Sequence, residues 1–98
     1  MVIPVVVRST SRPGHDEELK DMVRRHWTTL HREHLTTDRP AIVLQVDSAP
    51  AVFLELFEWK SEEAVRTAHD HPAIRDLWEA MEVMGTVEPW DGTYLELT

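Results

Sequence analysis

The segment 52–59, Val-Phe-Leu-Glu-Leu-Phe-Glu-Trp, constrains the fold most, because it reads as a β-strand that is apolar on both faces. Side chains of a strand alternate between the two faces of its sheet. One face is aliphatic and the other aromatic: the first carries Val52, Leu54 and Leu56, and the second carries Phe53, Phe57 and Trp59. A sheet with helices on one face and water on the other alternates apolar with polar residues. We therefore expect helices to cover one face and something else to cover the other.

Three more strands and two helical regions are expected around this strand. The strands are expected at 2–7, 41–46 and 86–97, and the helical regions at 16–34 and 61–84. The link 47–51 is short enough for an antiparallel hairpin. Pro72 divides the second helical region, since proline is tolerated as the first residue of a new helix. The order β-α-β-β-α-β predicts an α+β, ferredoxin-like protomer, with a four-stranded antiparallel sheet and its helices on one face.

Length and composition narrow the classes of partner. The 98 residues suit a single domain, 1–98, and so short a chain buries its apolar surface poorly alone, which favours a homodimer. Ten Lys plus Arg against 18 Asp plus Glu, a net charge of −8, argue against nucleic acid and membrane surfaces as partners. There is no cysteine for disulfides or thiolate zinc sites. With no recognisable signal peptide or membrane span, we expect a cytoplasmic protein.

Three stretches of the sequence resemble a known family. They are Phe-Glu-Trp-Lys-Ser-Glu-Glu-Ala at 57–64, Ala-His-Asp-His-Pro at 68–72 and Ile-Arg-Asp-Leu-Trp at 74–78. The start of the first helix, Arg-Pro-Gly-His-Asp-Glu-Glu-Leu at 12–19, fits as well. Together they are similar to the antibiotic biosynthesis monooxygenase-like family of the dimeric α/β-barrel superfamily. In that family a strand ending in Trp leads into a short acidic helix, a His and a second helix segment. The resemblance extends over nearly the whole chain, and the order of elements matches best.

The resemblance implies a homodimer whose two sheets face each other as a barrel, which would cover the second apolar face. It also implies a pocket between the helices and the sheet. Known activities in the family include cofactor-free oxygenation of polyphenolic rings, haem degradation and quinol oxidation. In the haem-degrading branch a His on the last helix ligates iron, whereas Trp78 occupies the corresponding position here, and the pocket Trp of that branch falls near Ala68. We therefore expect no haem, and no sequence signature indicates another redox cofactor.

His26 is the first candidate for chemistry. Intervals of three or four residues place it with Leu19, Val23 and Leu30 on the apolar stripe of the first helix. A polar ring there needs a partner, and it could act as a general base or orient an acidic phenol. The alternative is a half-buried His bonded to a backbone carbonyl or to the partner subunit.

Four further histidines are weighed beside it. His69 and His71 bracket the break in the second helical region, and the resemblance places such a His near the pocket mouth. His71 is thus a second candidate base and His69 a candidate ligand contact, with capping of a helix end as the alternative. His31 and His34 have a spacing compatible with two metal ligands, but no third ligand is indicated and we expect no metal site.

The apolar stripes of the two longest helical segments converge on the sheet, where we expect a pocket. Its expected lining is His26, Leu30, Trp59, Ile74, Trp78 and Met81. Trp59 and Trp78 would serve as walls for a planar ligand, or would simply fill the core. Glu55, between Phe53 and Phe57 on one strand face, could pair with an Arg or His across the dimer or lie in the pocket.

Two functions follow from these residues. The first is a cofactor-independent monooxygenase, an oxidoreductase, acting on a small aromatic or polyphenolic substrate. A deprotonated phenol or anthrone-like ring can reduce O₂ directly, so the protein needs an apolar cavity, a base and hydrogen-bond donors to the developing oxyanion. The second is a non-catalytic dimeric domain that binds a small apolar ligand or serves as an accessory protein.

Overall fold

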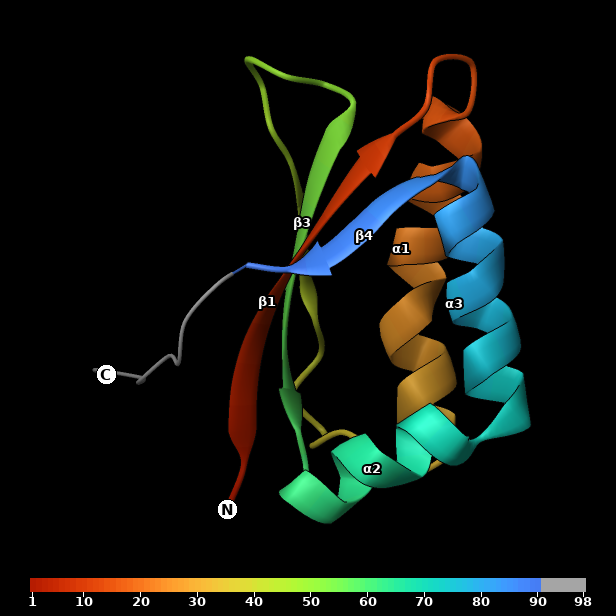
Figure 1. Ribbon diagram of the computed structural model, residues 1–98. Coiled ribbons are helices and arrows are strands. Elements are labelled where there is room, and N and C mark those ends of the chain that lie inside the picture. Colours follow the sequence, from red (N-terminus) through yellow and green to blue (C-terminus); the bar gives the residue numbers. More distant parts are fainter. Residues whose placement is uncertain (91–98) are drawn as a thin grey trace.

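A computed structural model describes residues 1–90, which form a sheet with helices packed on one of its faces (Figure 1). The antiparallel sheet has the strand order β2-β3-β1-β4. Its strands are β1 (Ile3–Ser11), β2 (Ile42–Gln45), β3 (Val52–Trp59) and β4 (Gly85–Pro89). The helices are α1 (Asp16–Arg32), α2 (Glu62–Asp70) and α3 (Pro72–Met84). This is the ferredoxin-like α+β arrangement that the order of elements predicted, and the prediction is confirmed.

The two central strands, β3 and β1, have one face in contact with the helices. In β3, buried residues alternate with half-buried ones along the whole strand, so Phe53, Glu55, Phe57 and Trp59 face the helices. The register with β1 places Val5 opposite Phe57 and Val7 opposite Glu55, so both valines share that face. The aromatic face of β3 is therefore the one that the helices cover.

The core lies between this face and the helices, in two packed groups. The larger group consists of Leu30, Leu35, Phe57, Trp59, Ala64, Ala68 and Ile74. The smaller consists of Leu19, Val23, Phe53 and Met81. Trp78 packs against both groups, which places it at the seam between them.

The ends of two elements differ from expectation. α1 stops at Arg32 instead of reaching His34, because His34 has a φ of 60°, a left-handed conformation that reverses the chain. The amide of Leu35 then bonds back to the carbonyl of Leu30 at 3.1 Å. The last strand, expected at 86–97, is β4 at Gly85–Pro89, and the part of that expectation from 91 to 97 lies outside the described residues.

The break in the second helical region is as predicted, and a side chain caps the start of each of its two helices, α2 and α3. Ser61 Oγ accepts from the amide of Ala64 at 3.1 Å at the start of α2. α3 begins at Pro72, and the Nδ1 atom of His71 accepts from the amide of Ala73 at 3.2 Å. Among the described residues no helix has the length and apolar character needed to cross a membrane.

The opposite face of the sheet, here called the outer face, carries no helix of the described chain (Figure 1). Its apolar side chains are Pro4, Val6, Ile42, Leu44, Val52, Leu54 and Leu56. Ile42 and Leu44 on the edge strand β2 are 54% and 47% exposed, while Leu54 and Leu56 in β3 are half-buried. The second apolar face predicted from the sequence is therefore present, and no helix within residues 1–90 covers it.

Candidate functional site

Two elements bring a histidine and a carboxylate together in the core. His26 lies on the buried stripe of α1 with Leu19, Val23 and Leu30, as its spacing predicted. Glu55 lies on the face of β3 that the helices cover. His26 is 4% exposed and Glu55 is 1% exposed, so each must satisfy its polar atoms inside the protein.

The His26 ring is held from both sides. Its Nδ1 atom lies 2.8 and 2.9 Å from the two carboxylate oxygens of Glu55. Its Nε2 atom accepts a hydrogen bond of 2.8 Å from the indole Nε1–H of Trp78. Because an indole nitrogen can only donate, Nε2 carries the lone pair and Nδ1 carries the proton that is donated to Glu55. We call Glu55, His26 and Trp78 the buried chain.

The buried chain runs from the sheet to the surface. Glu55 stands on β3, His26 on α1 and Trp78 on α3, where Trp78 is half-buried. The exposed ring of His69 packs edge-on against Trp78, with ring centroids 5.0 Å apart. Hydrogen bonds thus connect the interior carboxylate to Trp78, and a ring contact connects Trp78 to an exposed histidine at the end of α2.

This arrangement has the parts of a general base. A carboxylate bonded to Nδ1 fixes the tautomer and stabilises the imidazolium that forms when Nε2 takes a proton. The Phe57 ring lies edge-on to His26 at 5.7 Å and keeps that side apolar. The lone pair on Nε2 is the position at which this ring could take a proton, and in this structure it accepts the hydrogen bond from Trp78.

The aliphatic residues expected to line a pocket lie buried in the core. Leu30 and Ile74 are 0% exposed and Met81 is 1% exposed, so no water-sized space adjoins these three side chains. Leu30, Ile74 and Trp59 pack within the larger core group, and Met81 lies in the smaller one. The structure does bring His26 and Trp78 together, through their hydrogen bond.

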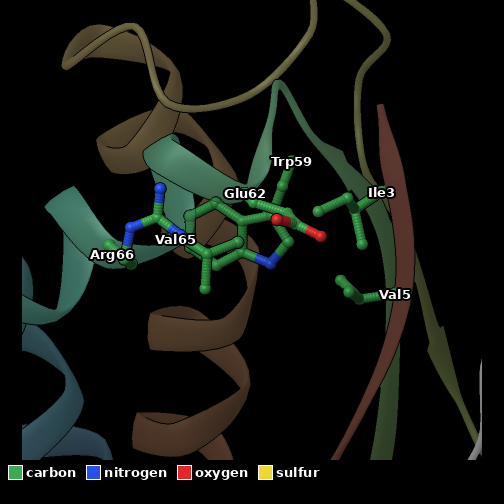
Figure 2. A pocket seen from close by; sticks show the side chains of 6 residues that line it. All are labelled: Ile3, Val5, Trp59, Glu62, Val65 and Arg66. Atoms are coloured by element: carbon green, nitrogen blue, oxygen red, sulfur yellow. The ribbon is translucent and has the colours of Figure 1, made fainter. Parts of the chain in front are cut away.

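A shallow hollow of about 380 Å³ lies beside Trp59 instead. Its lining is Ile3, Val5, Trp59, Glu62, Val65 and Arg66. Figure 2 shows the Trp59 indole in the middle, with the β1 side chains on one side of it and Val65 and Arg66 of α2 on the other. Trp59 is the one member of the expected pocket that borders this hollow.

The hollow and the buried chain are joined by aromatic rings. The Trp59 and Phe57 ring centroids are 5.3 Å apart, and Phe57 is the ring that packs against His26. Two aromatic side chains, Trp59 and Phe57, therefore lie between a planar molecule in the hollow and the imidazole. Sequence reasoning missed the walls that β1 and α2 contribute, because Ile3, Val5 and Val65 carry no signal beyond ordinary strand and helix hydrophobicity.

The two histidines at the helix break have different surroundings. His71 is half-buried; its Nδ1 caps α3 and its Nε2 lies 3.4 Å from the carboxylate of Glu33. Both of its nitrogens are thus engaged, and it makes the capping contact that was its alternative role. His69 is exposed and touches the buried chain through Trp78.

His31, in the last turn of α1, and His34, just beyond its end, do not form a metal centre. Among the described residues no group of His, Asp or Glu has the arrangement of metal ligands. His31 Nε2 bonds instead to Asp38 at 2.9 Å. That hydrogen bond, with the charge of His31, lowers the pKa of the Asp38 carboxyl from its ordinary value. His34 is exposed at the turn after α1.

Comparison with known proteins identifies the fold. No family model matches the sequence, and no curated protein sequence matches it. SnoaB, a cofactor-independent oxygenase from Streptomyces nogalater, superimposes with a TM-score of 0.76 at 17% identity, covering 98% of this chain and 96% of that one. A structure described as an antibiotic biosynthesis monooxygenase superimposes with a TM-score of 0.70 at 15% identity, covering 96% of this chain and 100% of that one. A conserved protein of unknown function from Bacteroides thetaiotaomicron superimposes with a TM-score of 0.79 at 9% identity, covering 95% of this chain and 97% of that one.

At these identities the likeness establishes the fold and leaves the chemistry to the residues of this chain. The protein has the fold of the antibiotic biosynthesis monooxygenase-like proteins, as the three sequence stretches predicted.

Proposed function

We propose that the protein is a cofactor-independent monooxygenase acting on a small phenolic aromatic substrate. The observation that carries the proposal is the buried chain, in which Glu55 holds the Nδ1 proton of His26 and leaves the Nε2 lone pair as a base at 4% exposure. The fold shared with SnoaB, itself described as a cofactor-independent oxygenase, supports the same chemistry.

His26 would supply the one step that such a reaction requires of the protein. The Nε2 atom takes the proton of a phenol, or of the acidic CH₂ of an anthrone-like ring, and the electron-rich anion then reduces O₂. For the anthrone-like ring the balance is CH₂ + O₂ → C=O + H₂O: two C–H bonds and the O–O bond break, one oxygen atom stays on the ring carbon, and the other leaves as water with both protons. No external reductant is needed, because the substrate supplies the electrons.

The hollow beside Trp59 would seat the substrate. Its walls are apolar side chains and an indole, which suits a planar aromatic molecule. The carboxylate of Glu62 and the guanidinium of Arg66 are exposed at its edge. From there the ring would reach His26 past Phe57 and Trp78, the two rings that pack against the imidazole.

We propose further that the working form is a homodimer in the cytoplasm, with the outer faces of two sheets packed together. The outer face presents aliphatic side chains from three strands, and exposed apolar patches of this kind mark interaction surfaces. A second copy of the same face offers matching aliphatic surface.

The test is oxygen uptake on anthrone and 1,8-dihydroxyanthrone without added cofactor, with ¹⁸O₂ and mass spectrometry to show one labelled oxygen in the product. His26→Gln keeps a donor for Glu55 and an acceptor for Trp78 but removes the base. We expect it to lower the rate by about 100-fold or more, the usual contribution of a positioned base. His34→Asn is the matched control, because it replaces an exposed histidine with a residue that tolerates a positive φ. Full activity of His26→Gln would refute the role of His26.

A second candidate, a non-catalytic small-ligand-binding domain, is favoured by one observation: the helix–sheet interface is closed at Leu30, Ile74 and Met81, while the hollow is open at the surface. Under this alternative, planar aromatic molecules bind beside Trp59 and quench its fluorescence, and no oxygen is consumed. Binding that depends on Trp59 and Val65 but not on His26, without turnover, would favour it over the oxygenase.

A further inference from the structure

The Nε2 lone pair of His26 is already occupied. The indole N–H of Trp78 donates to it at 2.8 Å, and an imidazole nitrogen has a single lone pair in the plane of its ring. A substrate O–H that is to reach this atom must therefore take the place of the indole. Trp78 and a phenolic ligand compete for one acceptor.

The surroundings of Trp78 make it the movable member of the buried chain. Glu55 and His26 are almost wholly buried, whereas Trp78 is half-buried on α3. Its outer side is contacted by the ring of His69, which is itself exposed. Trp78 also packs against both core groups, so apolar side chains would border the space that a displaced ring leaves.

We propose that Trp78 is a specificity-determining residue whose indole stands in for the substrate. The ligand that replaces it is a planar aromatic molecule of comparable size with an O–H or N–H donor on the edge of its ring. This inference rests on the proposed function in one respect, namely that the ligand reaches His26. It adds that ring-edge donors are selected because Nε2 is the acceptor, and that Trp78 sets the strength of this selection.

The test compares two ligands of similar shape, 2-naphthol and 2-methoxynaphthalene, of which the first has the donor. Affinities are measured by isothermal titration calorimetry under nitrogen, so that no oxidation occurs. In the wild-type protein 2-naphthol exchanges one hydrogen bond for another, and we expect it to bind less than about 3-fold more tightly than the ether. Trp78→Phe removes the competing N–H and keeps an aromatic ring, and the preference should rise to about 10-fold, the value of one net hydrogen bond.

Trp27→Phe is the matched control. It also removes an indole N–H from a helix packed on the sheet, but that N–H has no hydrogen-bond partner among residues 1–90. The control should leave the preference for 2-naphthol unchanged. If Trp78→Phe changes the affinities for both ligands equally, Trp78 only fills space and the inference is overturned.

A second measurement uses only the wild-type protein, and it tests the inference even if the Trp78→Phe variant does not fold. In ¹⁵N-labelled wild-type protein, the indole N–H resonance of Trp78 is assigned through its contact with the ring protons of His69. Saturating 2-naphthol should move this resonance away from its hydrogen-bonded position, and 2-methoxynaphthalene should not. A resonance that both ligands leave in place would overturn the inference as well.

These outcomes separate the inference from the proposed function. A 10-fold preference in Trp78→Phe together with no oxygen uptake on any phenol would leave a phenol-binding site without oxygenase activity. Oxygen uptake that depends on His26, combined with an unchanged ligand preference in Trp78→Phe, would keep the oxygenase and reject the role of Trp78.

Discussion

Glu55 occupies a position on β3 where the strand alternation calls for an apolar side chain, between Phe53 and Phe57. Its carboxylate is 1% exposed and lies against the imidazole of His26. A buried carboxylate is tolerated when its charge is compensated by well-aligned donors. Glu55 therefore stabilises the fold only as long as His26 is in place, and the two residues act as a unit.

Substitutions at Glu55 should show this dependence. Glu55→Ala leaves the Nδ1–H of His26 buried without an acceptor and opens a cavity, so we expect a loss of about 3 kcal/mol in the free energy of unfolding. Glu55→Gln keeps an acceptor oxygen for the same N–H, and its loss should be about 1 kcal/mol. Urea unfolding followed by circular dichroism measures both. Equal losses for the two variants would show that the contribution comes from the charge of Glu55, which both variants remove, and not from its volume or its acceptor oxygen.

For single residues, the sequence predicts where His26 and Glu55 lie but not that they contact each other. The helical spacing placed His26 on the buried stripe, and the strand alternation singled out Glu55 as unexpected. Their pairing within one chain could not be read from the sequence, since the two residues are 29 positions apart and meet only through the packing of α1 on β3. The bond from Trp78 spans 52 positions and was missed for the same reason.

The junction between α2 and α3 determines how α3 presents Trp78. Pro72 supplies the fixed φ of a first helical residue, and His71 satisfies the amide of Ala73. The second nitrogen of His71 faces Glu33, just beyond the end of α1, at 3.4 Å. This single residue thus ties together the ends of two helices.

His71 can be tested against its candidate role as a base. Asparagine is a good N-cap, so His71→Asn should stay within about 0.5 kcal/mol of the wild-type stability, while His71→Ala should lose about 1 kcal/mol. If His71 only caps α3, oxygen uptake of the Asn variant is unchanged. Thermal unfolding and the uptake assay together decide the point, and a large loss of activity in a stable His71→Asn protein would restore His71 as a catalytic residue.

Two glycines, Gly85 at the start of β4 and Gly14 in the loop before α1, differ in the space around them. A Cβ at Gly85 would overlap the carbonyl oxygen of Thr10 in the neighbouring strand β1, so Gly85→Ala should lose more than about 2 kcal/mol or fail to fold. Gly14 has open space but a φ of 85°, so Gly14→Ala should lose only about 1 kcal/mol. Chemical denaturation of both variants gives the ranking, and the reverse order would show that β1 can yield at this contact.

Elements and their order are the part of the fold that sequence patterns predicted well, because alternation, helical spacing and proline act locally. The end of α1 was missed because it depends on the left-handed conformation of His34, which carries no composition signal. For the aliphatic wall of the expected pocket, the sequence predicts burial, and Leu30, Ile74 and Met81 are buried. Converging apolar stripes predict burial, but whether the space between them is filled depends on side-chain volumes in three dimensions.

For the whole molecule, the proposed dimer depends on the outer face. Leu54 lies on that face, and Phe53, its neighbour in sequence, lies in the core. We expect Leu54→Asp to give a folded monomer, because the carboxylate disrupts the interface and is solvated once the subunits separate. Phe53→Asp should unfold the protein, since a buried unpaired carboxylate costs several kcal/mol. Ser48→Asp, at an exposed position in the loop between β2 and β3, is the control.

Light scattering after size exclusion measures the mass of each variant, and circular dichroism reports whether it is folded. A wild-type protein that remains monomeric at micromolar concentration would contradict the dimer. So would a Leu54→Asp variant with the wild-type mass.

The central position of β1 in the sheet has a consequence for folding kinetics. β1 precedes β3 and β4 in the sequence and is synthesised before them, yet it pairs with β3 on one side and β4 on the other. The ion pair of Arg8 with Glu88 joins residues 80 positions apart. Contacts of such long range carry a high loop-closure entropy and slow the search for the native state. During translation β1 therefore stays unpaired until β3 and then β4 are made. In that interval both backbone edges of this valine-rich strand are open to wrong pairing.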